Sequence, residues 1–525
     1  MVEYKLNLNN FLEAAVLANP GQKIIYKDIE LTYTEFYRNV KNFAGNLIKI
    51  GVKPGDRVAV LDYDTINYMY CYYAIPMIGA TIHMINIRYP QEVLYYTIEN
   101  SEDTYIVVND DFMPILLHFK SMFGFIKGFI VYSENGYKKY DLPNVYSAAE
   151  MLNENNEKII PPEEDAIATL FYTSGTTGLP KGVYYSHRQL ILHSLASASA
   201  LTDSPSNLAK TSVLLPLVPM FHVHAWGMPY FGLMRGIKYI VPGKYEWDRI
   251  LDTMEKEHVT NSAMVPSILY LLMQAKKGPE ILQKLKPSVV IGGAALNEGL
   301  AAKAEALGMT LMTGYGMSET GPILTLATYN SEVMKMDEKD KKIYRRKTGI
   351  PIPMVEIRLV RDGRDIKNDN SEIGEIIVKA PWLTEGYIKD PEKTAKLWVD
   401  GWLHTGDLAT IDKLGYIKIV DRESDAVKSG GEFIPTMVLE DLISSVPGVN
   451  EVAVAKKSDE KWGERPLAFI LGTAKKQDII AAMQEYVDTG RIAKFWLPDD
   501  YIFVDEFVKT GTGKIDKKAL MKKME

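Results

Sequence analysis

The sequence predicts a multidomain α/β protein with a large N-terminal domain of βαβ-type sheets, a small β-rich region and a small, mobile α+β C-terminal domain. Two observations lead to this fold class. Strand-like apolar runs alternate with stretches of helical spacing in the first part of the chain, and short β-branched runs separated by turns replace them after Gly349. The length of 525 residues is enough for roughly three or four domain-sized units.

The N-terminal part carries the alternation most clearly. Strands are expected at 57–63 (RVAVLDY), 104–110 (TYIVVND) and 125–132 (FIKGFIVY), whereas TYTEFYRNVKNFAGNLIKIG has helical spacing. A further apolar run ends at Thr173 in a loop rich in Gly, Ser and Thr, and the pattern becomes helical after Ser186. We therefore expect strand, loop and helix in that order, within mainly parallel sheets.

The C-terminal part has a different pattern. The runs VEIRLVRDGRDI, EIGEIIVKAP and GYIKIVDR predict the β-rich region. The final ~100 residues follow the order helix, strand (EVAVAKK), strand (PLAFILG), helix (QDIIAAMQEYVDTG) and strand (DYIFVDEF), a small α+β domain by itself. We place the boundary between Asp421 and Asp425, which divides the chain into domains 1–420 and 421–525.

Composition excludes several classes of protein. The 60 Lys and Arg residues are outnumbered by 67 Asp and Glu, and no basic stripe is present, which disfavours nucleic acid as a partner. The single cysteine, Cys71, excludes a disulfide framework and a cysteine-rich zinc site. No apolar run approaches the ~20 residues of a membrane-spanning helix, and the first residues do not have the pattern of a secretory signal. We expect a soluble, cytoplasmic protein.

The segment YTSGTTGLPKG carries the strongest chemical signal. Its glycines and hydroxyl side chains offer backbone N–H groups and donors that suit a polyphosphate, and Lys181 adds a compact positive charge. The segment is not a Walker A loop, because Lys181 follows a proline and precedes a glycine where that motif needs Lys followed by Ser or Thr. A flexible surface loop is the alternative interpretation.

This segment resembles the signature of the adenylate-forming superfamily, which includes acyl-CoA synthetases, peptide-synthetase adenylation domains and beetle luciferases. Six further segments resemble the family's other motifs and follow in the family's order along the whole chain. They are VPMFHVHAW, IGGAA, GYGMSETGP, GWLHTGDL, DRESDAVKSGGEF and KTGTGKIDK. Seven matches in the same order make an unrelated fold improbable.

The resemblance implies a nucleotide site. In it Tyr315 stacks on adenine, Ser318 contacts the α-phosphate region, Glu319 reaches Mg²⁺, and Asp407 accepts the ribose hydroxyls with help from Arg422. Without the resemblance, GYGMSETGP would be interpreted as a turn-rich segment at the end of a strand, and Asp407 as a structural residue. The nucleotide-binding residues implied are Thr173, Ser174, Gly175, Thr176, Thr177, Gly178, Lys181, Gly293, Ala294, Gly314, Tyr315, Gly316, Ser318, Asp407 and Arg422.

Two histidines, His222 and His224, would face the same side if they lay on a strand, with the spacing of a metal pair. No third cluster of ligands with suitable spacing appears, so zinc is disfavoured. The resemblance implies that His222 is the catalytic histidine of the acid pocket. Without the resemblance, His224 would be interpreted as a core histidine whose ring is hydrogen-bonded. The acid-binding residues implied are Val223, His224, Trp226 and Gly292.

Two lysines carry most of the mechanism that the resemblance implies. Lys514 inserts between the carboxylate and the α-phosphate, where its charge offsets the negative charge that concentrates there. Lys428 faces the site in a second, thioester-forming arrangement, in which Gly430 and Gly431 let coenzyme A pass. The C-terminal domain rotates about Ser424, at a hinge position where the family usually has Asp or Lys.

The resulting prediction is an ATP-dependent acid–thiol ligase that uses Mg²⁺ and coenzyme A. VPMFHVHAW is similar to medium- and long-chain fatty acyl-CoA synthetases, in which a tryptophan near Trp226 can gate the tunnel. Fatty acids are therefore favoured, while His224 leaves short or hydroxylated acids open, and aryl acids are a further alternative. An adenylating enzyme that loads a carrier protein and a nonenzymatic nucleotide sensor are the other hypotheses, and a homodimer is possible.

Overall fold

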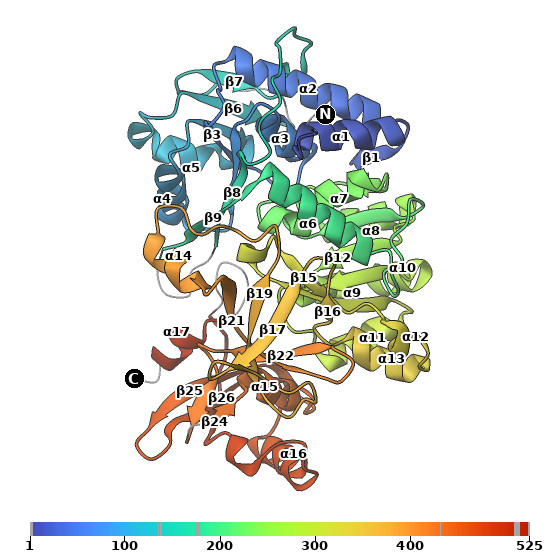
Figure 1. Ribbon diagram of the computed structural model, residues 1–525, viewed down its shortest axis with the longest axis vertical. Helices are drawn as coiled ribbons and strands as arrows, with labels where there is room; N and C mark the ends of the chain where they lie inside the picture. The colour runs from blue at the N-terminus through green and yellow to red at the C-terminus, as the bar shows by residue number, and fades with distance from the viewer. Residues whose placement is uncertain are drawn as a thin grey trace.

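The computed structural model describes residues 4–134, 136, 139–173, 179–430, 432–508 and 515–522. Within these residues the strands form four sheets, which Figure 1 shows in succession from the N-terminal elements at the top to the C-terminal elements at the bottom. The predicted fold class is confirmed, since two large α/β sheets are followed by a β-rich sheet and a small α+β unit. Among the helices of these residues, none has both the length and the apolar character needed to cross a membrane.

The seven-stranded sheet holds the first βαβ units, and its neighbouring strands are parallel except for one antiparallel pair. In spatial order its strands are β7 (Val145–Ser147), β6 (Gly128–Tyr132), β5 (Tyr105–Asn109), β3 (Arg57–Leu61), β4 (Thr81–Met84), β8 (Ile167–Thr173) and β9 (Lys181–Ser186). The helices of this part are α1 (Leu8–Ala18), α2 (Tyr33–Lys49), α3 (Ile66–Met77), α4 (Gln91–Ser101), α5 (Met113–His118) and α6 (His187–Ala200).

The predicted order of strand, loop and helix around Thr173 lacked one strand. The loop joins two antiparallel strands, since β9 pairs with β8 from Lys181 to Ser186, and only then does α6 begin. Ser186 caps α6 in a capping box with Gln189, which explains why the helical pattern starts there. Residues 181–186 (KGVYYS) form the last strand in the spatial order, so β9 is one edge of the sheet.

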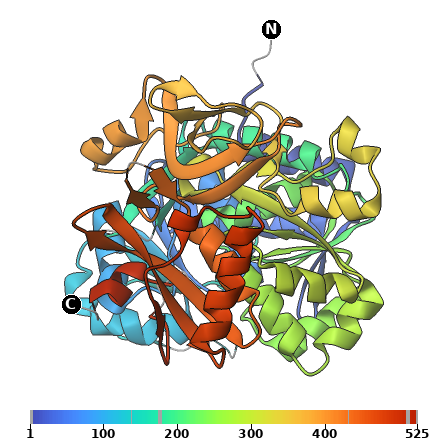
Figure 2. The same ribbon diagram turned by 90° about the horizontal axis from the view of Figure 1, so that it is seen from below.

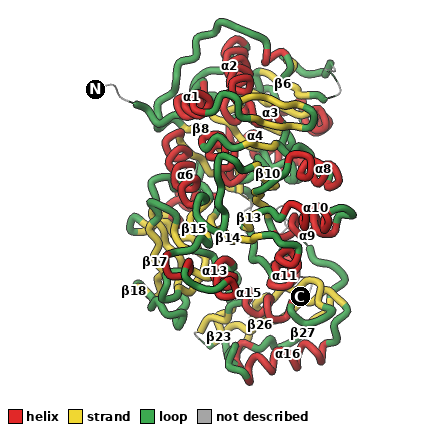
Figure 3. Tube along the Cα trace, turned by 90° about the vertical axis from the view of Figure 1, so that its right-hand side faces the viewer, coloured by secondary structure: helices red, strands yellow, loops and turns green. Residues whose placement is uncertain are grey.

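The nine-stranded sheet forms the middle of the molecule. In spatial order its strands are β16 (Ile350–Pro351), β15 (Ile323–Leu326), β14 (Thr310–Gly316), β13 (Ser288–Ile291), β12 (Asn261–Met264), β10 (Val213–Leu217), β11 (Lys238–Ile240), β1 (Lys23–Tyr26) and β2 (Ile29–Thr32). Its helices are α7 (Met228–Met234), α8 (Trp247–Glu257), α9 (Pro266–Gln274), α10 (Gly278–Leu285), α11 (Glu298–Ala306), α12 (Ser331–Met334) and α13 (Glu338–Arg345). Figure 3 shows helices on both sides of the central strands.

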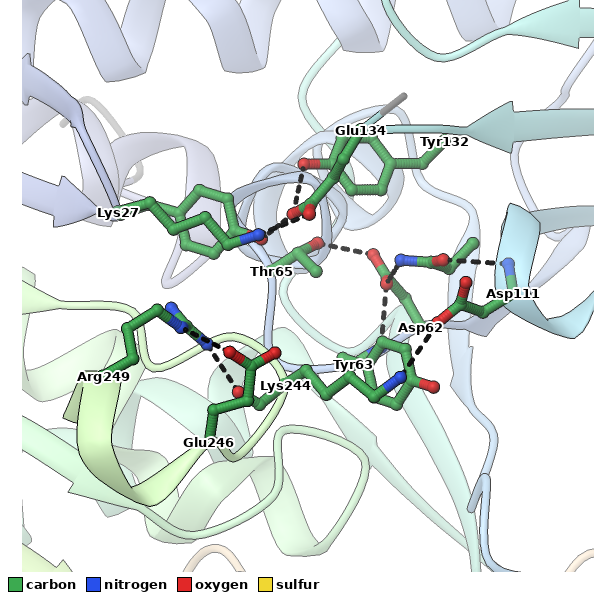
Figure 4. Close-up of polar contacts among 12 residues, drawn as sticks. Lys27, Asp62, Tyr63, Thr65, Asp111, Tyr132, Glu134, Lys244, Glu246 and Arg249 are labelled. Atoms are coloured by element: carbon green, nitrogen blue, oxygen red, sulfur yellow. Dashed lines mark hydrogen bonds and ion pairs between the residues drawn. The ribbon is translucent and has the colours of Figure 1, made fainter. Parts of the chain in front are cut away.

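The two large sheets share one hydrophobic core, to which α3 contributes ten of its twelve residues, all of which are buried. At their junction, charged side chains pair across the gap between the sheets (Figure 4). Lys27 contacts Glu134, and Nζ of Lys244 lies 3.2 Å from Oδ2 of Asp111. Asp62 lies behind them, where burial raises the pKa of its carboxyl to about 7. These contacts join the sheets and involve none of the predicted site residues.

The β-rich region is a six-stranded sheet. Its strands are β18 (Arg364–Asp365), β17 (Glu356–Arg361), β19 (Gly374–Lys379), β21 (Trp402–Ile411), β20 (Trp398–Val399) and β22 (Ile417–Arg422), the last paired with β21. Helix α14 (Pro391–Leu397) lies between β19 and β20 in the chain.

The C-terminal unit has its own sheet and its own core, formed by residues from Val427 to Tyr501. Its strands are β24 (Glu432–Ile434), β23 (Val427–Ser429), β26 (Gly463–Gly472), β25 (Val449–Asp459) and β27 (Tyr501–Phe503), and its helices are α15 (Thr436–Ser444), α16 (Lys476–Asp488) and α17 (Lys517–Lys522). Figure 2 shows this unit in front of the rest when the molecule is seen from below. Asn297 contacts it through a 2.6 Å hydrogen bond from Nδ2 to Oγ of Ser444.

Candidate active site

The two ends of the Gly/Ser/Thr loop are held side by side by the β8–β9 hairpin. Thr173 is the register partner of Lys181, so the loop leaves and re-enters the sheet at one point. Before it, the phenol hydroxyl of Tyr172 donates a 2.7 Å hydrogen bond to Oδ1 of Asn100. The predicted phosphate-binding residues Ser174, Gly175, Thr176, Thr177 and Gly178 lie outside the described residues.

Lys181 projects from the first position of β9 toward an aromatic ring. Its ammonium group lies 4.3 Å from the centroid of the Tyr387 ring, a cation–π distance. Burial lowers the pKa of Lys181, and the nearby carboxylate of Glu319 acts in the opposite direction. Among the described residues Lys181 forms no ion pair within 4 Å, so its charge is available to an anionic ligand.

Glu319 lies in a short 3₁₀ turn, η5 (Ser318–Thr320), which follows β14. The turn is held at its start by the Tyr185 hydroxyl, which donates to the carbonyl oxygen of Ser318 at 2.6 Å. Glu319 is buried, and its Oε1 accepts a 2.7 Å hydrogen bond from the Tyr387 hydroxyl. The carboxylate of Glu319 therefore contacts the hydroxyl of Tyr387, while the Lys181 ammonium lies over the ring of the same tyrosine.

The donors near Glu319 fit a magnesium ion that arrives with a nucleotide. Oε2 of Glu319 accepts no hydrogen bond from the part of the chain that the structure describes, so one hard oxygen is available. Mg²⁺ commonly takes one or two carboxylates and completes its shell with phosphate oxygens and water. Searched over the described residues, no three His, Cys, Asp or Glu side chains gather into a metal cluster, so a site made of protein ligands alone has no support there.

Tyr315, Asp407 and Arg422 form a second polar group. The Tyr315 hydroxyl donates to Oδ2 of Asp407 at 2.7 Å, and Nε of Arg422 lies 3.0 Å from Oδ1. Asp407 and Arg422 are register partners on β21 and β22, whereas Tyr315 comes from β14 of the nine-stranded sheet. Because a carboxylate can accept about four hydrogen bonds, Asp407 has room for two further donors.

Two glycines of GYGMSETGP lie in tight packing, and at Gly316 the close backbone requires glycine. A Cβ on Gly316 would lie 1.7 Å from the carbonyl oxygen of Pro322, and one on Gly314 would lie 3.0 Å from Cδ2 of Leu326. A side chain at Gly316 would therefore displace the turn that carries Glu319.

Residues 223–227, which overlap the end of the segment VPMFHVHAW, form a left-handed turn, η4 (Val223–Gly227). This turn replaces the strand on which His222 and His224 would have faced the same side. Val223, His224, Ala225 and Trp226 have φ between 46° and 57°, and all four are buried. Left-handed backbone costs about 1–2 kcal/mol per non-glycine residue, so surrounding packing must hold this turn. His222 precedes it with extended backbone, and the two histidines therefore do not share a strand face.

The turn sets the Trp226 ring against the IGGAA segment. A Cβ on Gly292 would lie 2.9 Å from Cη2 of Trp226, so only glycine lets the ring approach this closely. Gly293 has φ 75° and a Cβ there would lie 3.8 Å from Cζ2 of the same ring, while Ala294 beside it is exposed. The structure therefore brings Trp226 together with Gly292 and Gly293.

His224, a residue of the same turn, is fully buried. Its Nε2 lies 2.7 Å from Oγ1 of Thr169, and the rings of Phe171, Tyr185 and Tyr230 surround it at centroid distances of 5.1, 5.2 and 6.2 Å. Burial lowers the pKa of His224 to about 3, so the ring is neutral at physiological pH.

Of the predicted C-terminal site residues, the structure describes Lys428 and Gly430, and both contact neighbours within residues 421–525. Lys428 lies half-exposed on β23, 3.8 Å from Oε1 of Glu423 and 4.9 Å from the centroid of the Phe433 ring. Gly430 has φ 59° and packs against Trp462, whereas Gly431 and Lys514 lie outside the described residues.

Sequence reasoning missed Tyr387 and Thr169. Tyr387 contacts both Glu319 and Lys181, and Thr169 holds the ring of His224. Neither residue stands in one of the seven quoted segments. The pattern GYIKDP around Tyr387 has the Gly–aromatic order also seen in GYGMSETGP, but that order alone does not distinguish a site residue from a core tyrosine.

Comparison with known proteins agrees with this geometry. Residues 12–388 match the family model "AMP-binding enzyme" and residues 438–514 match "AMP-binding enzyme C-terminal domain". The chain is 35% identical to a long-chain-fatty-acid–CoA ligase of Thermus thermophilus, covering 99% of this chain and 96% of that protein. It is 31% identical to a medium-chain-fatty-acid–CoA ligase of Ectopseudomonas oleovorans, covering 100% and 95%.

A solved structure extends the similarity to the fold as a whole. ATP-bound MatB from Rhodopseudomonas palustris has a TM-score of 0.83 at 26% identity and is matched over 99% of both chains. The family models together span most of the chain, and the first includes Lys181, Tyr315 and Glu319. The protein therefore belongs to the family of AMP-binding enzymes.

Proposed function

We propose that this enzyme is an ATP-dependent acyl-CoA ligase. A carboxylate attacks the α-phosphate of ATP to form an acyl adenylate and diphosphate, and the thiol of coenzyme A then attacks the mixed anhydride and expels AMP. The observation that carries the proposal is the convergence of Lys181, Glu319, Tyr315 and Asp407 from three different sheets. The relatives named as fatty-acid–CoA ligases support the same reaction.

The first half-reaction assigns a role to each polar group. Asp407 accepts the ribose hydroxyls while Arg422 and Tyr315 orient it, and the Tyr315 ring stacks on adenine. Ser318 and the loop ending at Lys181 contact the phosphates. Mg²⁺ would be held by Glu319 and would neutralise phosphate charge. Closure of the site around these groups keeps water from the adenylate.

The second half-reaction needs the C-terminal unit to move. We propose that residues 421–525 form the mobile domain and turn about Ser424, between β22 of one sheet and β23 of the next. Lys428 would then exchange with Lys514 at the site, and Gly430 and Gly431 would pass the coenzyme A arm. The Ser424 hydroxyl bonds only its neighbour Asp425 among the described residues (3.0 Å), so the side chain at the proposed hinge makes no hydrogen bond to the N-terminal part that rotation would break.

A fatty acid is the substrate that we favour. Trp226 lies at the glycines of IGGAA, and apolar or aromatic side chains surround the turn that carries it. One observation favours a short or hydroxylated acid as a second candidate: the buried imidazole of His224, held by Thr169. Among the relatives, one from Metallosphaera sedula is named as a 4-hydroxybutyrate–CoA ligase and is 29% identical.

The test is release of AMP and diphosphate from Mg-ATP with acetate, 4-hydroxybutyrate, benzoate, octanoate and palmitate, each with and without coenzyme A. AMP release that requires both an acid and coenzyme A supports the ligase and names its acid class. Diphosphate release without turnover of coenzyme A points to loading of a carrier protein. Absence of both with every acid contradicts the proposal and favours a nucleotide sensor.

Trp226→Ala is expected to shift the acid profile toward longer or bulkier acids, because it opens the space between η4 and Gly292. We expect kcat/KM for the longest acid of the panel to rise by about tenfold relative to the shortest, the size of a change of one to two methylenes in an apolar pocket. Phe231→Leu on buried α7 is the control for loss of aromatic volume. An acid profile that is unchanged by Trp226→Ala would remove this residue from the pocket.

A cytoplasmic location and a homodimer stay predictions. The buried Cys71 is compatible with a reducing compartment. Size-exclusion chromatography with light scattering would test the dimer.

A further inference from the structure

Tyr387 contacts both charged groups of the nucleotide site, Lys181 and Glu319. It lies between β19 and α14, where it forms an isolated antiparallel β-bridge with Val183 of β9. The next residue, Ile388, donates its backbone N–H to the carbonyl oxygen of Gly182 at 2.9 Å. Tyr387 itself is buried. The segment is therefore fixed alongside the strand that presents Lys181.

The same segment also holds the turn that carries Glu319. The Trp382 indole donates to the carbonyl oxygen of Thr320 at 3.0 Å, and the backbone N–H of Thr384 donates to the carbonyl oxygen of Glu319 at 3.1 Å. The Tyr387 hydroxyl then reaches the Glu319 side chain itself. Residues 382–387 thus restrain Glu319 at both its backbone and its carboxylate.

One tyrosine contacts opposite charges with different parts of its side chain. Its hydroxyl donates to Oε1 of Glu319 at 2.7 Å, and its ring face lies 4.3 Å from the ammonium group of Lys181. Lys181 and Glu319 form no direct ion pair within 4 Å in the described part of the chain. Both groups are partly or fully buried, where the attraction between opposite charges is stronger than in water.

We propose that Tyr387 is a positioning residue that separates Lys181 from Glu319 and orients both before Mg-ATP binds. Without it, the two side chains would collapse into a direct ion pair, and the ligand would have to break that pair. The lysine would then be withdrawn from the phosphates and the carboxylate from the metal. The inference rests on the roles proposed above for Lys181 and Glu319, and it adds a residue that the seven motifs do not contain.

Two features of the surroundings favour this role over simple core packing. A carboxylate oxygen only accepts hydrogen bonds, so the Tyr387 hydroxyl is the donor in its contact with Glu319. The backbone N–H of Tyr387 donates to Oγ1 of Thr394 at 2.9 Å, which ties the residue to the first turn of α14. A fixed donor of this kind costs little reorganisation when the ligand arrives.

The test is a binding measurement that needs no acid substrate. Titration calorimetry with α,β-methylene-ATP over a range of Mg²⁺ concentrations gives nucleotide affinity and its dependence on the metal. Tyr387→Phe keeps the ring and loses the hydroxyl, so we expect the Mg²⁺ concentration for half-maximal binding to rise about tenfold, as for loss of a hydrogen bond to a charged group. Tyr387→Leu also loses the ring and should weaken nucleotide binding by a further threefold or more.

Matched controls separate positioning from stability. Tyr33→Phe removes another buried phenol hydroxyl, which donates to the carbonyl oxygen of Ile237 and makes no contact with the site. It should lower the melting temperature without changing the Mg²⁺ dependence. In a Glu319→Gln background, Tyr387→Phe should add nothing further to the metal dependence, because the partner charge is already absent.

Each outcome bears on one proposal. If wild-type protein binds no nucleotide at any Mg²⁺ concentration, the proposed function fails. If wild-type binding depends on Mg²⁺ but Tyr387→Phe behaves like Tyr33→Phe, or if its effect is additive with that of Glu319→Gln, the positioning role is overturned while the ligase stands.

Discussion

Lys514→Ala is expected to lower acyl-adenylate formation by about 10²- to 10³-fold, the effect seen when one group that stabilises transition-state charge is removed. The physical reason is that a carboxylate attacks a phosphate, so two negative groups meet and a point charge between them lowers the barrier. The measurement is acid-dependent exchange of labelled diphosphate into ATP. Thioester formation from a chemically supplied acyl adenylate should change by less than about threefold, because that step no longer concentrates this charge.

Lys428→Ala is the matched control for this prediction. It removes the same charge from a half-exposed lysine on β23 of the same C-terminal unit. Adenylate formation should be retained and thioester formation reduced, the opposite pattern to Lys514→Ala. Equal losses in both half-reactions for Lys514→Ala would contradict the role proposed for that lysine.

Asp407→Ala is expected to lower kcat/KM for ATP by about 10²- to 10⁴-fold. Asp407 would accept two ribose hydroxyls, and each hydrogen bond to a charged group contributes about 1.5–3 kcal/mol. The substitution also leaves Arg422 without its partner at 3.0 Å and the Tyr315 hydroxyl without its acceptor. Steady-state kinetics at saturating acid, with ATP varied, gives this value directly.

Two variants control for loss of fold. Asp407→Asn keeps an acceptor for Tyr315 and loses the charge, so its effect should be intermediate. Asp365→Ala removes another aspartate of the same sheet, paired with Arg358 at 2.8 Å on the exposed surface, and should leave ATP kinetics unchanged. If Asp407→Ala left kcat/KM for ATP unchanged, the carboxylate would have a structural role in the sheet and no role in nucleotide binding.

Much of the fold follows from local sequence pattern. The alternation of apolar runs predicted the strands β3, β5 and β6, and the C-terminal order of helix, two strands, helix and strand is the order observed. These predictions succeed because buried strands and amphipathic helices impose periods that are visible within a dozen residues. The extra strand β9 was missed because KGVYYS opens with the Lys-Gly of the loop motif.

The left-handed turn η4 shows why other features escaped prediction. VPMFHVHAW contains one apolar or aromatic residue after another, a local pattern that is typical of a strand. Val223 and Trp226 nevertheless adopt positive φ. Only packing from neighbouring elements can hold non-glycine residues in this backbone conformation, because the local preference is against it. As a consequence of this turn, the Trp226 ring packs against Gly292.

The sequence by itself determined the order of the seven motifs and the class of enzyme, and it predicted which residues contact ATP. Tertiary structure decided how those residues meet: that Tyr387 contacts both Lys181 and Glu319, that Thr169 holds His224, and that Asp407 is shared by Tyr315 and Arg422. The reason is that a motif records residue types along one segment, whereas the distance between charges on three sheets depends on how those sheets pack.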